Sequence, residues 1–366
     1  MTPAQVERPG VYAGPGRYVQ GRGVLDTLGE LVRPHGTRPL VVMDEPVRAL
    51  LGERVEAALA GLRPQFALLR TEITYAAVDE LVAAAAGADV AVGVGGGKVL
   101  DAAKGVALRL GLPVVTVPTV ASNDSPASGA IAMYDDGHSM VSVDRLPRHP
   151  EVVLVDTDVI VRAPVAFLRA GIGDAISKKF EADACRTATG VAPVGGRPLR
   201  VAGAIAEECF RTLSAYGEAA LAACGSGQVT AEFDAVVEAV ILMSGLGFEN
   251  GGLSLAHALT RGLMSARGAS SVPHGLHVAW GLLVQLAAEG RSDVEVLEVV
   301  SLLRRLGLPT RLGELSLPDA APEEIEAIAR LTMTAPHVAN MPVPMDESAI
   351  VVAVRRVEAL AVRSSA

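Results

Sequence analysis

The sequence predicts an α/β domain with a parallel sheet, followed by an all-helical domain. Over residues 1–163, short runs rich in Val alternate with segments of helical spacing, which is the pattern of consecutive βα units. After Pro164 the strand signals stop, and long helical patterns continue toward the end of the chain. We therefore expect an α/β domain over residues 1–163, an all-helical domain over residues 164–366, and a ligand site in the cleft between them.

The first three expected strands of the first domain are each followed by an expected helix. The expected strands cover residues 38–44, 65–72, 89–95 and 112–119, the helices between them cover 45–62, 76–87 and 99–111, and further strand-like runs lie at 129–134, 138–143 and 151–160. The expected helices of the second domain cover residues 165–185, 198–224, 230–246, 253–265 and 276–288.

Composition excludes several classes of function. Of the 366 residues, 50% are hydrophobic and only 3% aromatic, and the net charge of −9 argues against a nucleic-acid or anionic membrane surface. No apolar run reaches the length of a membrane span, and the first ten residues contain no apolar core of a signal peptide. The three cysteines, Cys185, Cys209 and Cys224, show no pairing or metal spacing. We expect a cytoplasmic protein without nucleic-acid or membrane partners.

A glycine-rich loop lies between the third expected strand and its helix, in ADVAVGVGGGKVLDAAK (residues 88–104). It matches neither the G-x-G-x-x-G dinucleotide fingerprint nor the P-loop, since Lys98 and Val99 stand at the wrong positions. A turn between a strand and a helix nevertheless offers free N–H groups and the positive end of the helix dipole to an anion. The loop is thus either a phosphate site to which Lys98 adds charge or a plain tight turn.

Two further features belong to the same edge of the expected sheet. TVPTVASNDSPAS (residues 116–128), rich in hydroxyl and amide groups, follows the next strand, and ligands of open α/β sheets bind at the carboxyl ends of strands. Asp44 ends the first expected strand, where a carboxylate suits the hydroxyls of an adenosine ribose and repels a 2′-phosphate. This favours NAD over NADP. The alternative role of Asp44 is the N-cap of the helix that follows.

Three segments of the helical half carry possible metal ligands. Asp174 follows a Gly-x-Gly turn, His257 lies inside an apolar helix, and His274 follows a proline, with His277 one turn later as its rival. Two imidazoles and one carboxylate leave a coordination position open, as in catalytic zinc sites, and the same set suits Fe(II). The alternatives are a hydrogen-bonded core histidine for His257 and a helix cap for Asp174.

These segments resemble the glycerol dehydrogenases of the iron-containing (group III) alcohol dehydrogenase superfamily. The resemblance runs from PGRYVQGRGVLDTLGELV (residues 15–32) to HVANMP (residues 337–342). It implies a Rossmann-like NAD-binding domain joined to a helical metal-binding domain, the architecture shared with dehydroquinate synthase. The matching pieces are GVGGGKVLDAAK, VPTVASNDSPAS, PEVVLVDTDVI, AGIGDAISKKFEA, SGLGFENGGLSLAHAL and HGLHVAWG.

The resemblance also implies residue roles. It assigns Asp174, His257 and His274 to a metal, zinc in this branch with Fe²⁺ as the other candidate, and prefers His274 to His277. It assigns Asp124 to the hydroxyls of a small alcohol such as glycerol, oxidised by NAD, and implies a homo-oligomer, an octamer. The residues that it assigns to NAD are Asp44, Gly96, Gly97, Lys98, Asp101, Thr119, Ser122, Ser128, Ala130 and Tyr134.

Several residues depart from the family pattern near the expected pocket, namely Asn123, Ser125, Ala130, Thr260, Arg261, Leu276 and His277. They bear on the choice of substrate, for which a 2-hydroxy acid, an amino alcohol and glycerol 1-phosphate are the alternatives. A phosphorylated substrate would need basic side chains, and the expected pocket segments offer only Arg261, Lys178 and Lys179. A non-catalytic nucleotide-binding protein is the alternative outside enzymes, and the full set of metal ligands argues against it.

Overall fold

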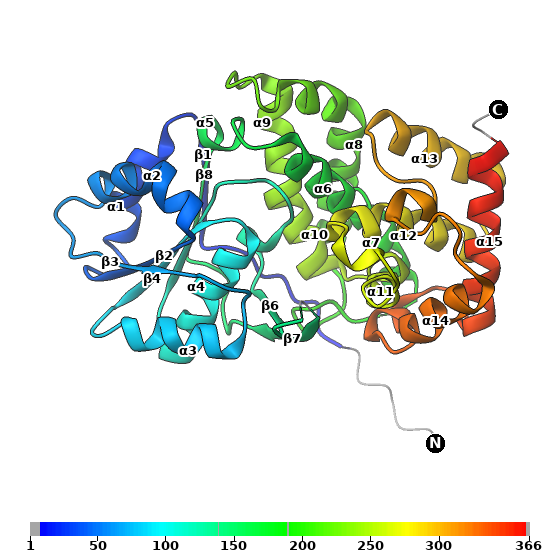
Figure 1. Cartoon of the computed structure of the whole chain (residues 1–366), viewed down its shortest axis with the longest axis horizontal. Helices are drawn as coiled ribbons and strands as arrows, with labels where there is room; N and C mark the ends of the chain where they lie inside the picture. The colour runs from blue at the N-terminus through cyan, green and yellow to red at the C-terminus, as the bar shows by residue number, and fades with distance from the viewer. Residues whose placement is uncertain (1–7, 138, 189, 364–366) are drawn as a thin grey trace. The chain divides into compact units, whose positions relative to one another are not determined.

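The computed structural model describes residues 8–137, 139–188 and 190–363 (Figure 1). Its internal contacts divide the chain into two compact units. The sheet unit comprises Gly14–Ile172 and Tyr216–Gly245. Within the described chain, the helical unit comprises residues 8–13, 173–215 and 246–363.

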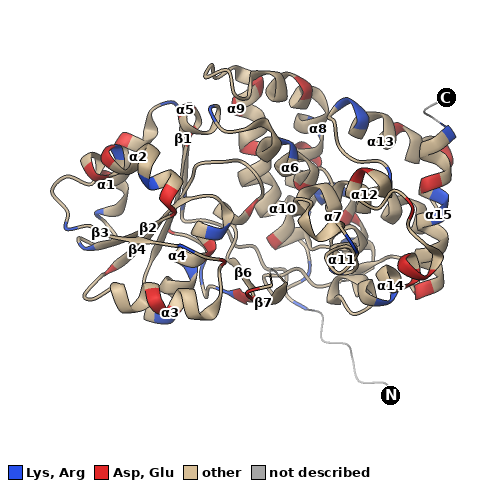
Figure 2. Cartoon of the chain, in the orientation of Figure 1, with Lys and Arg blue, Asp and Glu red and all other residues tan. Residues whose placement is uncertain are grey.

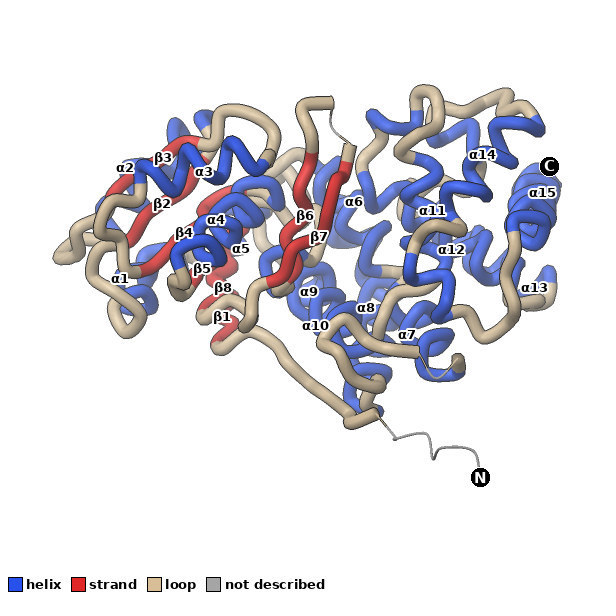
Figure 3. The backbone as a smooth tube through the Cα atoms, turned by 90° about the horizontal axis from the view of Figure 1, so that it is seen from below, coloured by secondary structure: helices blue, strands red, loops and turns tan. Residues whose placement is uncertain are grey.

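A six-stranded parallel sheet forms the centre of the sheet unit, as predicted (Figure 3). The strand order is β1–β8–β5–β4–β2–β3. The sequence pattern predicted every strand except β1, an edge strand whose polar residues hide the alternation. The strands are β1 (Arg17–Gly21), β2 (Pro39–Met43), β3 (Gln65–Leu68), β4 (Val90–Gly95), β5 (Val114–Pro118) and β8 (Val152–Asp156).

Several of the helices that follow strands begin at side-chain caps. Asp44 accepts a hydrogen bond from the Val47 N–H at 2.8 Å, and Thr74 accepts one from the Ala77 N–H at 3.1 Å. The strand-like run predicted over residues 151–160 was too long, because the Asp156 side chain accepts from the Asp158 N–H and starts a helix. The helices are α1 (Leu28–Val32), α2 (Glu45–Ala58), α3 (Tyr75–Ala84), α4 (Gly97–Leu110), α5 (Thr157–Ile160) and α9 (Ala231–Glu238).

Apolar residues cover both faces of the sheet. Successive residues of β2 alternate between two clusters, with Leu40 and Val42 in one and Val41 and Met43 in the other. Residues of α3 and α4 complete the first cluster, and residues of α1 and α2 complete the second. Helices therefore lie on both faces, as the alternating pattern predicted.

A two-stranded antiparallel hairpin stands apart from the parallel sheet (Figure 3). It is formed by β6 (Ala130–Tyr134) and β7 (Met140–Arg145). These strands match the runs predicted over residues 129–134 and 138–143, although His138 lies outside the described residues.

The division of the chain into these two units differs from the single sequence boundary predicted at residue 163. The sheet unit continues to Ile172, and the chain returns to it over Tyr216–Gly245. In this return, Gln20 of β1 donates a hydrogen bond to the Asp234 carbonyl at 2.8 Å. Periodicity reports only local sequence, so it cannot show that a helical segment packs back onto an earlier domain.

Helices make up the helical unit (Figure 1). The predicted helix 165–185 is two helices, and the predicted helix 230–246 runs from α9 through the π-helical turn η3 (Ala239–Met243) into α10. Helix α11 packs against α12 and α14. The helices with residues in this unit are α6 (Val165–Ala175), α7 (Lys178–Thr187), α8 (Arg200–Ala223), α10 (Ser244–Gly251), α11 (Leu255–Leu263), α12 (His274–Ala288), α13 (Asp293–Arg305), α14 (Pro322–Thr332) and α15 (Glu347–Arg363).

Among the residues that the structure describes, none of the helices is both long enough and apolar enough to cross a bilayer. Figure 2 shows Lys and Arg interspersed with Asp and Glu along the helices.

Candidate active site

Three predicted metal ligands converge in the helical unit. Asp174 lies in the last turn of α6, His257 in α11, and His274 is the first residue of α12. One ligand atom from each lies within 4.8 Å of the others, and Oδ1 of Asp174 is 3.1 Å from Nε2 of His257. Asp174 and His257 are buried, whereas His274 is exposed. The cluster therefore combines two buried ligands with one exposed ligand, as a site that binds both a metal and a substrate requires.

Close helix packing explains why these three segments meet. A Cβ atom at Gly173 would lie 2.5 Å from the carbonyl oxygen of Gly275, so glycine allows the end of α6 to approach the start of α12. A Cβ atom at Gly281 would lie 2.6 Å from the carbonyl oxygen of Ala256, so glycine also brings α12 against α11. Pro273 precedes His274 as the N-cap and fixes where α12 begins.

The buried carboxylate of Glu181, on α7, orients His257. Its Oε2 lies 2.6 Å from His257 Nδ1, and its Oε1 accepts the backbone N–H groups of Ser254 at 2.8 Å and His257 at 3.1 Å. The hydroxyl of Ser177 donates to Oε2 at 2.8 Å. A carboxylate only accepts, so His257 Nδ1 carries a hydrogen, and Nε2 is the ring nitrogen that faces Asp174, which is the arrangement of metal-binding histidines.

The sequence analysis missed Glu181. A signal was present, because Glu181 follows Asp174 by seven residues, which is two helical turns, in the same polar-interrupted segment. The break between α6 and α7 weakens that argument, so only the fold shows that both side chains reach His257.

The electrostatics of the cluster suit metal binding. Burial alone would raise the pKa of Asp174, but the Lys178 ammonium and His257 hold it well below its usual range. Burial would also raise the pKa of Glu181, but His257 and Lys178 outweigh the effect of burial and lower this pKa to about 2. His274 is exposed as a residue, but its ring lies against that of His257, with 5.5 Å between the ring centroids, and desolvation there lowers its pKa to about 4 against the opposing field of Asp174. An ionised Asp174 and a neutral His274 are the forms that bind metal. At His257, burial lowers the pKa, but the Glu181 and Asp174 carboxylates outweigh burial and raise it, so a metal would have to displace a proton there.

His277, the rival to His274, lies outside this cluster. Its ring is fully buried, and Nε2 donates to the carbonyl oxygen of Ala269 at 2.9 Å. Burial lowers the pKa of His277, so the neutral ring suits its surroundings. The hydroxyl of Thr260, another departure from the family pattern, donates to the carbonyl of His257 at 2.7 Å. Both side chains are thus engaged with the backbone.

The basic residues considered for a phosphorylated substrate are also engaged. Arg261 donates to the carbonyl oxygen of Thr334 at 3.0 Å, and Lys179 pairs with Glu207. Lys178 is buried inside the ligand cluster, where Nζ lies 2.8 Å from Asp174 Oδ1. The contacts of these three residues do not favour a phosphate site.

The predicted cofactor loops lie in the sheet unit. Strands β5, β4 and β2 are adjacent and parallel, so Thr119, the glycine loop and Asp44 follow the carboxyl ends of three neighbouring strands. Gly96 is the N-cap of α4 and provides no side-chain cap, so the first N–H groups of α4 point to the loop side of the helix. A Cβ atom at Gly97 would lie 2.8 Å from Nδ2 of Asn123. This edge fits a phosphate bound by backbone groups.

Two charged residues of α4 differ in their surroundings. The Lys98 side chain is 60% exposed, and its Nζ lies 2.5 Å from Oε2 of the buried Glu72. Asp101 is buried, with Oδ1 accepting from Lys104 at 3.0 Å and from Ser125 Oγ at 2.6 Å. Lys98 is therefore placed to meet an anion, whereas Asp101 anchors the neighbouring loop.

Lys104, which the sequence analysis did not single out, strengthens that anchor. Its fully buried Nζ donates to the carbonyl oxygens of Ser125 at 2.6 Å and Ala130 at 3.0 Å. Asp101 Oδ2 also accepts the Ala132 N–H at 3.0 Å. Together these bonds hold residues 125–132 against α4.

The remaining predicted cofactor residues lie in or near the same loops. The Thr119 N–H donates to the Gly95 carbonyl at 3.1 Å, and Ser128 Oγ accepts the Ala130 N–H at 2.9 Å. Ser122, Ala130 and Tyr134 are partly exposed, and burial raises the pKa of Tyr134, with Asp101 and Glu72 adding to it.

The buried Asp124, predicted to contact substrate, accepts a hydrogen bond at Oδ2 from Ser244 Oγ at 2.8 Å. Its neighbour Asn123 accepts the Ser125 N–H at 3.2 Å. The loop conformation thus fixes the position of the Asp124 carboxylate.

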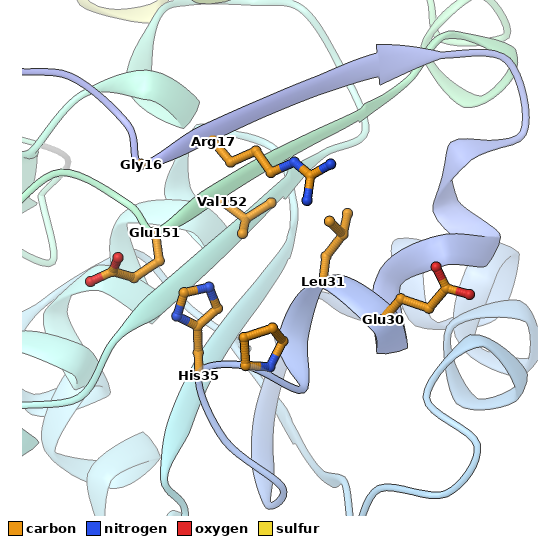
Figure 4. A pocket seen from close by; sticks show the side chains of 8 residues that line it. Gly16, Arg17, Glu30, Leu31, His35, Glu151 and Val152 are labelled. Atoms are coloured by element: carbon orange, nitrogen blue, oxygen red, sulfur yellow. The ribbon is translucent and has the colours of Figure 1, made fainter.

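A cavity of about 210 Å³ lies elsewhere in the sheet unit (Figure 4). It opens beside the amino ends of β1 and β8, at Arg17 and Val152, with Glu30, His35 and Glu151 in its wall. The predicted cofactor residues follow the carboxyl ends of the strands, so this cavity does not belong to their site.

Comparison with known proteins identifies the family. Residues 19–164 match the iron-containing alcohol dehydrogenases. The chain is 37% identical over 323 residues to a glycolaldehyde reductase of Halobacterium salinarum. The matched residues cover 87% of this chain and 88% of the relative. It is 38% identical over 323 residues to a glycerol dehydrogenase of Escherichia coli, with 87% of this chain and 88% of the relative covered. The chain belongs to the iron-containing alcohol dehydrogenase family.

Solved structures of this family confirm the predicted fold. The probable glycerol dehydrogenase from Sinorhizobium meliloti 1021 is 34% identical, with a TM-score of 0.91 over 97% of this chain and 99% of that chain. The glycerol dehydrogenase from Schizosaccharomyces pombe is 32% identical, with a TM-score of 0.92 over 98% of this chain and 93% of that chain.

Membership of the iron-containing alcohol dehydrogenase family implies a divalent metal and NAD. The residues present fit a metal, because two imidazoles and a carboxylate meet and Glu181 directs Nε2 of His257 toward Asp174. They also fit a dinucleotide, because the start of α4 offers backbone N–H groups beside Lys98.

Proposed function

We propose that this alcohol dehydrogenase oxidises a small polyol, glycerol or a close relative, with NAD as the hydride acceptor and a divalent metal at Asp174, His257 and His274. The observation that carries the proposal is this three-ligand cluster, with the Glu181 carboxylate behind it and the exposed His274 at its surface. Such a cluster leaves a coordination position for a substrate hydroxyl.

Different residues of this chain have different roles in the proposed reaction. A bound metal supplies a Lewis acid that lowers the pKa of the substrate hydroxyl, and NAD supplies the redox chemistry. Glu181 keeps the hydrogen on Nδ1 of His257, so that Nε2 remains a donor to the metal. Asp124 accepts a hydrogen bond from a substrate hydroxyl, and its own position is held by Ser244.

The start of α4 binds the cofactor in this proposal. Gly96 and Gly97 allow the pyrophosphate to approach the backbone, and Lys98 balances its charge. Asp44 binds the ribose hydroxyls, which favours NAD over NADP. Asp101 acts indirectly, by holding the loop that contains Ser128 and Ala130.

Zinc is the metal that we propose, from the resemblance to the glycerol dehydrogenases, although the donor set also suits Fe²⁺. We further propose that the enzyme works in the cytoplasm as a homo-oligomer, an octamer by resemblance. Light scattering at micromolar protein concentration tests this, and a monomeric mass would refute it.

The substrate is best defined by a screen that follows NADH formation. The relatives include a glycolaldehyde reductase, at 37% identity, and the hydroxycarboxylate dehydrogenase A of Escherichia coli, at 32% identity. The screen should therefore contain glycerol, other vicinal diols, 2-hydroxy acids and amino alcohols, with glycolaldehyde in the reverse direction. Turnover of diols that is lost with a chelator and restored by Zn²⁺ supports the proposal, and chelator-resistant turnover contradicts it.

A further inference from the structure

A lysine lies inside the proposed metal-ligand cluster. Nζ of Lys178 is 2.8 Å from Oδ1 of Asp174 and 3.0 Å from Nε2 of His257. The Lys178 side chain is only 1% exposed, so solvent does not compete for its charge. One residue of α7 therefore contacts two of the three ligand atoms that a metal would use.

The partners of His257 show that Lys178 and a metal could not both occupy its Nε2 position. Because Nδ1 is engaged with Glu181, Nε2 is the nitrogen left for another partner, and it lies 3.0 Å from the Lys178 amino group and 3.1 Å from Oδ1 of Asp174. A metal bound to His257 needs the lone pair of that same nitrogen. The ammonium and the metal are thus alternative occupants of His257 Nε2, and they also share the charge of Asp174.

We propose that Lys178 is an internal cation that competes with the divalent metal for His257 and Asp174. This inference rests on the proposed metal site and adds a property to it: this chain holds its metal more weakly than its three ligands alone would. In the metal-free protein, the ammonium pairs with a carboxylate that would otherwise be a buried uncompensated charge.

The ring of Phe248 offers the displaced ammonium another contact. Its centroid lies 5.6 Å from Nζ of Lys178, which is within the range of a cation–π interaction. The cost of moving the ammonium away from His257 is reduced by this contact.

The test compares metal affinity in Lys178→Met and Lys178→Gln with that of the unmodified enzyme. Lys179→Met is the matched control, because the next residue pairs with Glu207 outside the cluster. Zn²⁺ and Co²⁺ dissociation constants are measured by competition with a chelating indicator. We expect both Lys178 variants to bind either metal about 10- to 100-fold more tightly, the scale of changes around metal ligands, and the control to match the unmodified enzyme.

Thermal unfolding with and without Zn²⁺ separates competition from a purely structural role. Loss of the ammonium should lower the midpoint of the metal-free protein and enlarge the increase caused by Zn²⁺. An equal loss in both states, with unchanged metal affinity, would overturn the proposal. So would weaker metal binding with an altered Co²⁺ visible spectrum, because the amine would then be a ligand.

His257→Ala distinguishes this inference from the proposed function. If metal binding survives His257→Ala, the proposed metal site itself is wrong. If His257→Ala abolishes binding while the Lys178 variants bind like the unmodified enzyme, the site stands and only the competition is refuted.

Discussion

The metal-ligand cluster and the cofactor loop show two ways of building a site. The metal-ligand cluster and the two charged side chains beside it, Lys178 and Glu181, come from four helices and are buried except for His274. Their charges are paired with one another. The cofactor loop consists of glycines and backbone N–H groups at the start of α4, with one largely exposed lysine. Substitutions should therefore have large effects in the metal-ligand cluster, where a lost partner leaves a buried charge, and smaller effects at the cofactor loop.

The largest effect is expected from His257→Ala. This change removes a ligand and leaves Glu181 and Asp174 without a shared partner. We expect metal content to fall to background and kcat/KM to fall by about a thousandfold or more, since the Lewis acid is lost. Metal analysis of the purified variant and NADH formation provide the measurement. Normal metal content in the variant would place the metal elsewhere.

Glu181→Gln should have the next largest effect, because it acts through His257. The amide keeps the shape of the side chain but presents a weaker acceptor to Nδ1 of His257. We expect metal affinity to fall about 10- to 100-fold, with activity restored by excess Zn²⁺. A titration of activity against free Zn²⁺ measures this. Activity that excess metal cannot restore would show a role other than orienting His257.

Asp124→Asn should affect the substrate and spare the cofactor. The amide keeps its bond with Ser244 available but removes the charge that we propose accepts a substrate hydroxyl. A hydrogen bond to a charged group contributes about 1.5–3 kcal/mol, so kcat/KM for a vicinal diol should fall roughly 10- to 100-fold or more. NADH binding, followed by fluorescence, should not change. Ser244→Ala is the control, because it keeps the Asp124 charge but removes the hydrogen bond that holds the carboxylate in position.

The sequence predicted the sheet, and it singled out three residues that the fold brings together, for physical reasons. Strands β2, β4 and β5 are continuous apolar runs ended by turn residues, and parallel strands bring their carboxyl ends to one edge. Spacing could not choose between His274 and His277, because both lie on one face of α12; the contact of His277 with Ala269 excludes it from the cluster. Similarly, only tertiary packing shows that Lys178 turns into the ligand cluster while Lys179 does not.

The smallest effect is expected at Asp44, which has two roles to separate. Its Oδ1 caps α2 through the Val47 N–H, and we propose that the same carboxylate binds the adenosine ribose of NAD. Asp44→Ala would remove both, with a stability loss of about 1 kcal/mol from the cap alone. Asp44→Ser keeps a capping oxygen and removes only the charge.

We therefore expect Asp44→Ser to unfold at nearly the same temperature as the unmodified enzyme but to discriminate less between NAD and NADP. The measurement is the ratio of kcat/KM for the two cofactors. A serine oxygen no longer repels a 2′-phosphate, so the ratio should narrow mainly through better use of NADP. If Asp44→Ser keeps the full preference for NAD while Asp44→Ala loses stability, Asp44 is a helix cap and the ribose is recognised by another group.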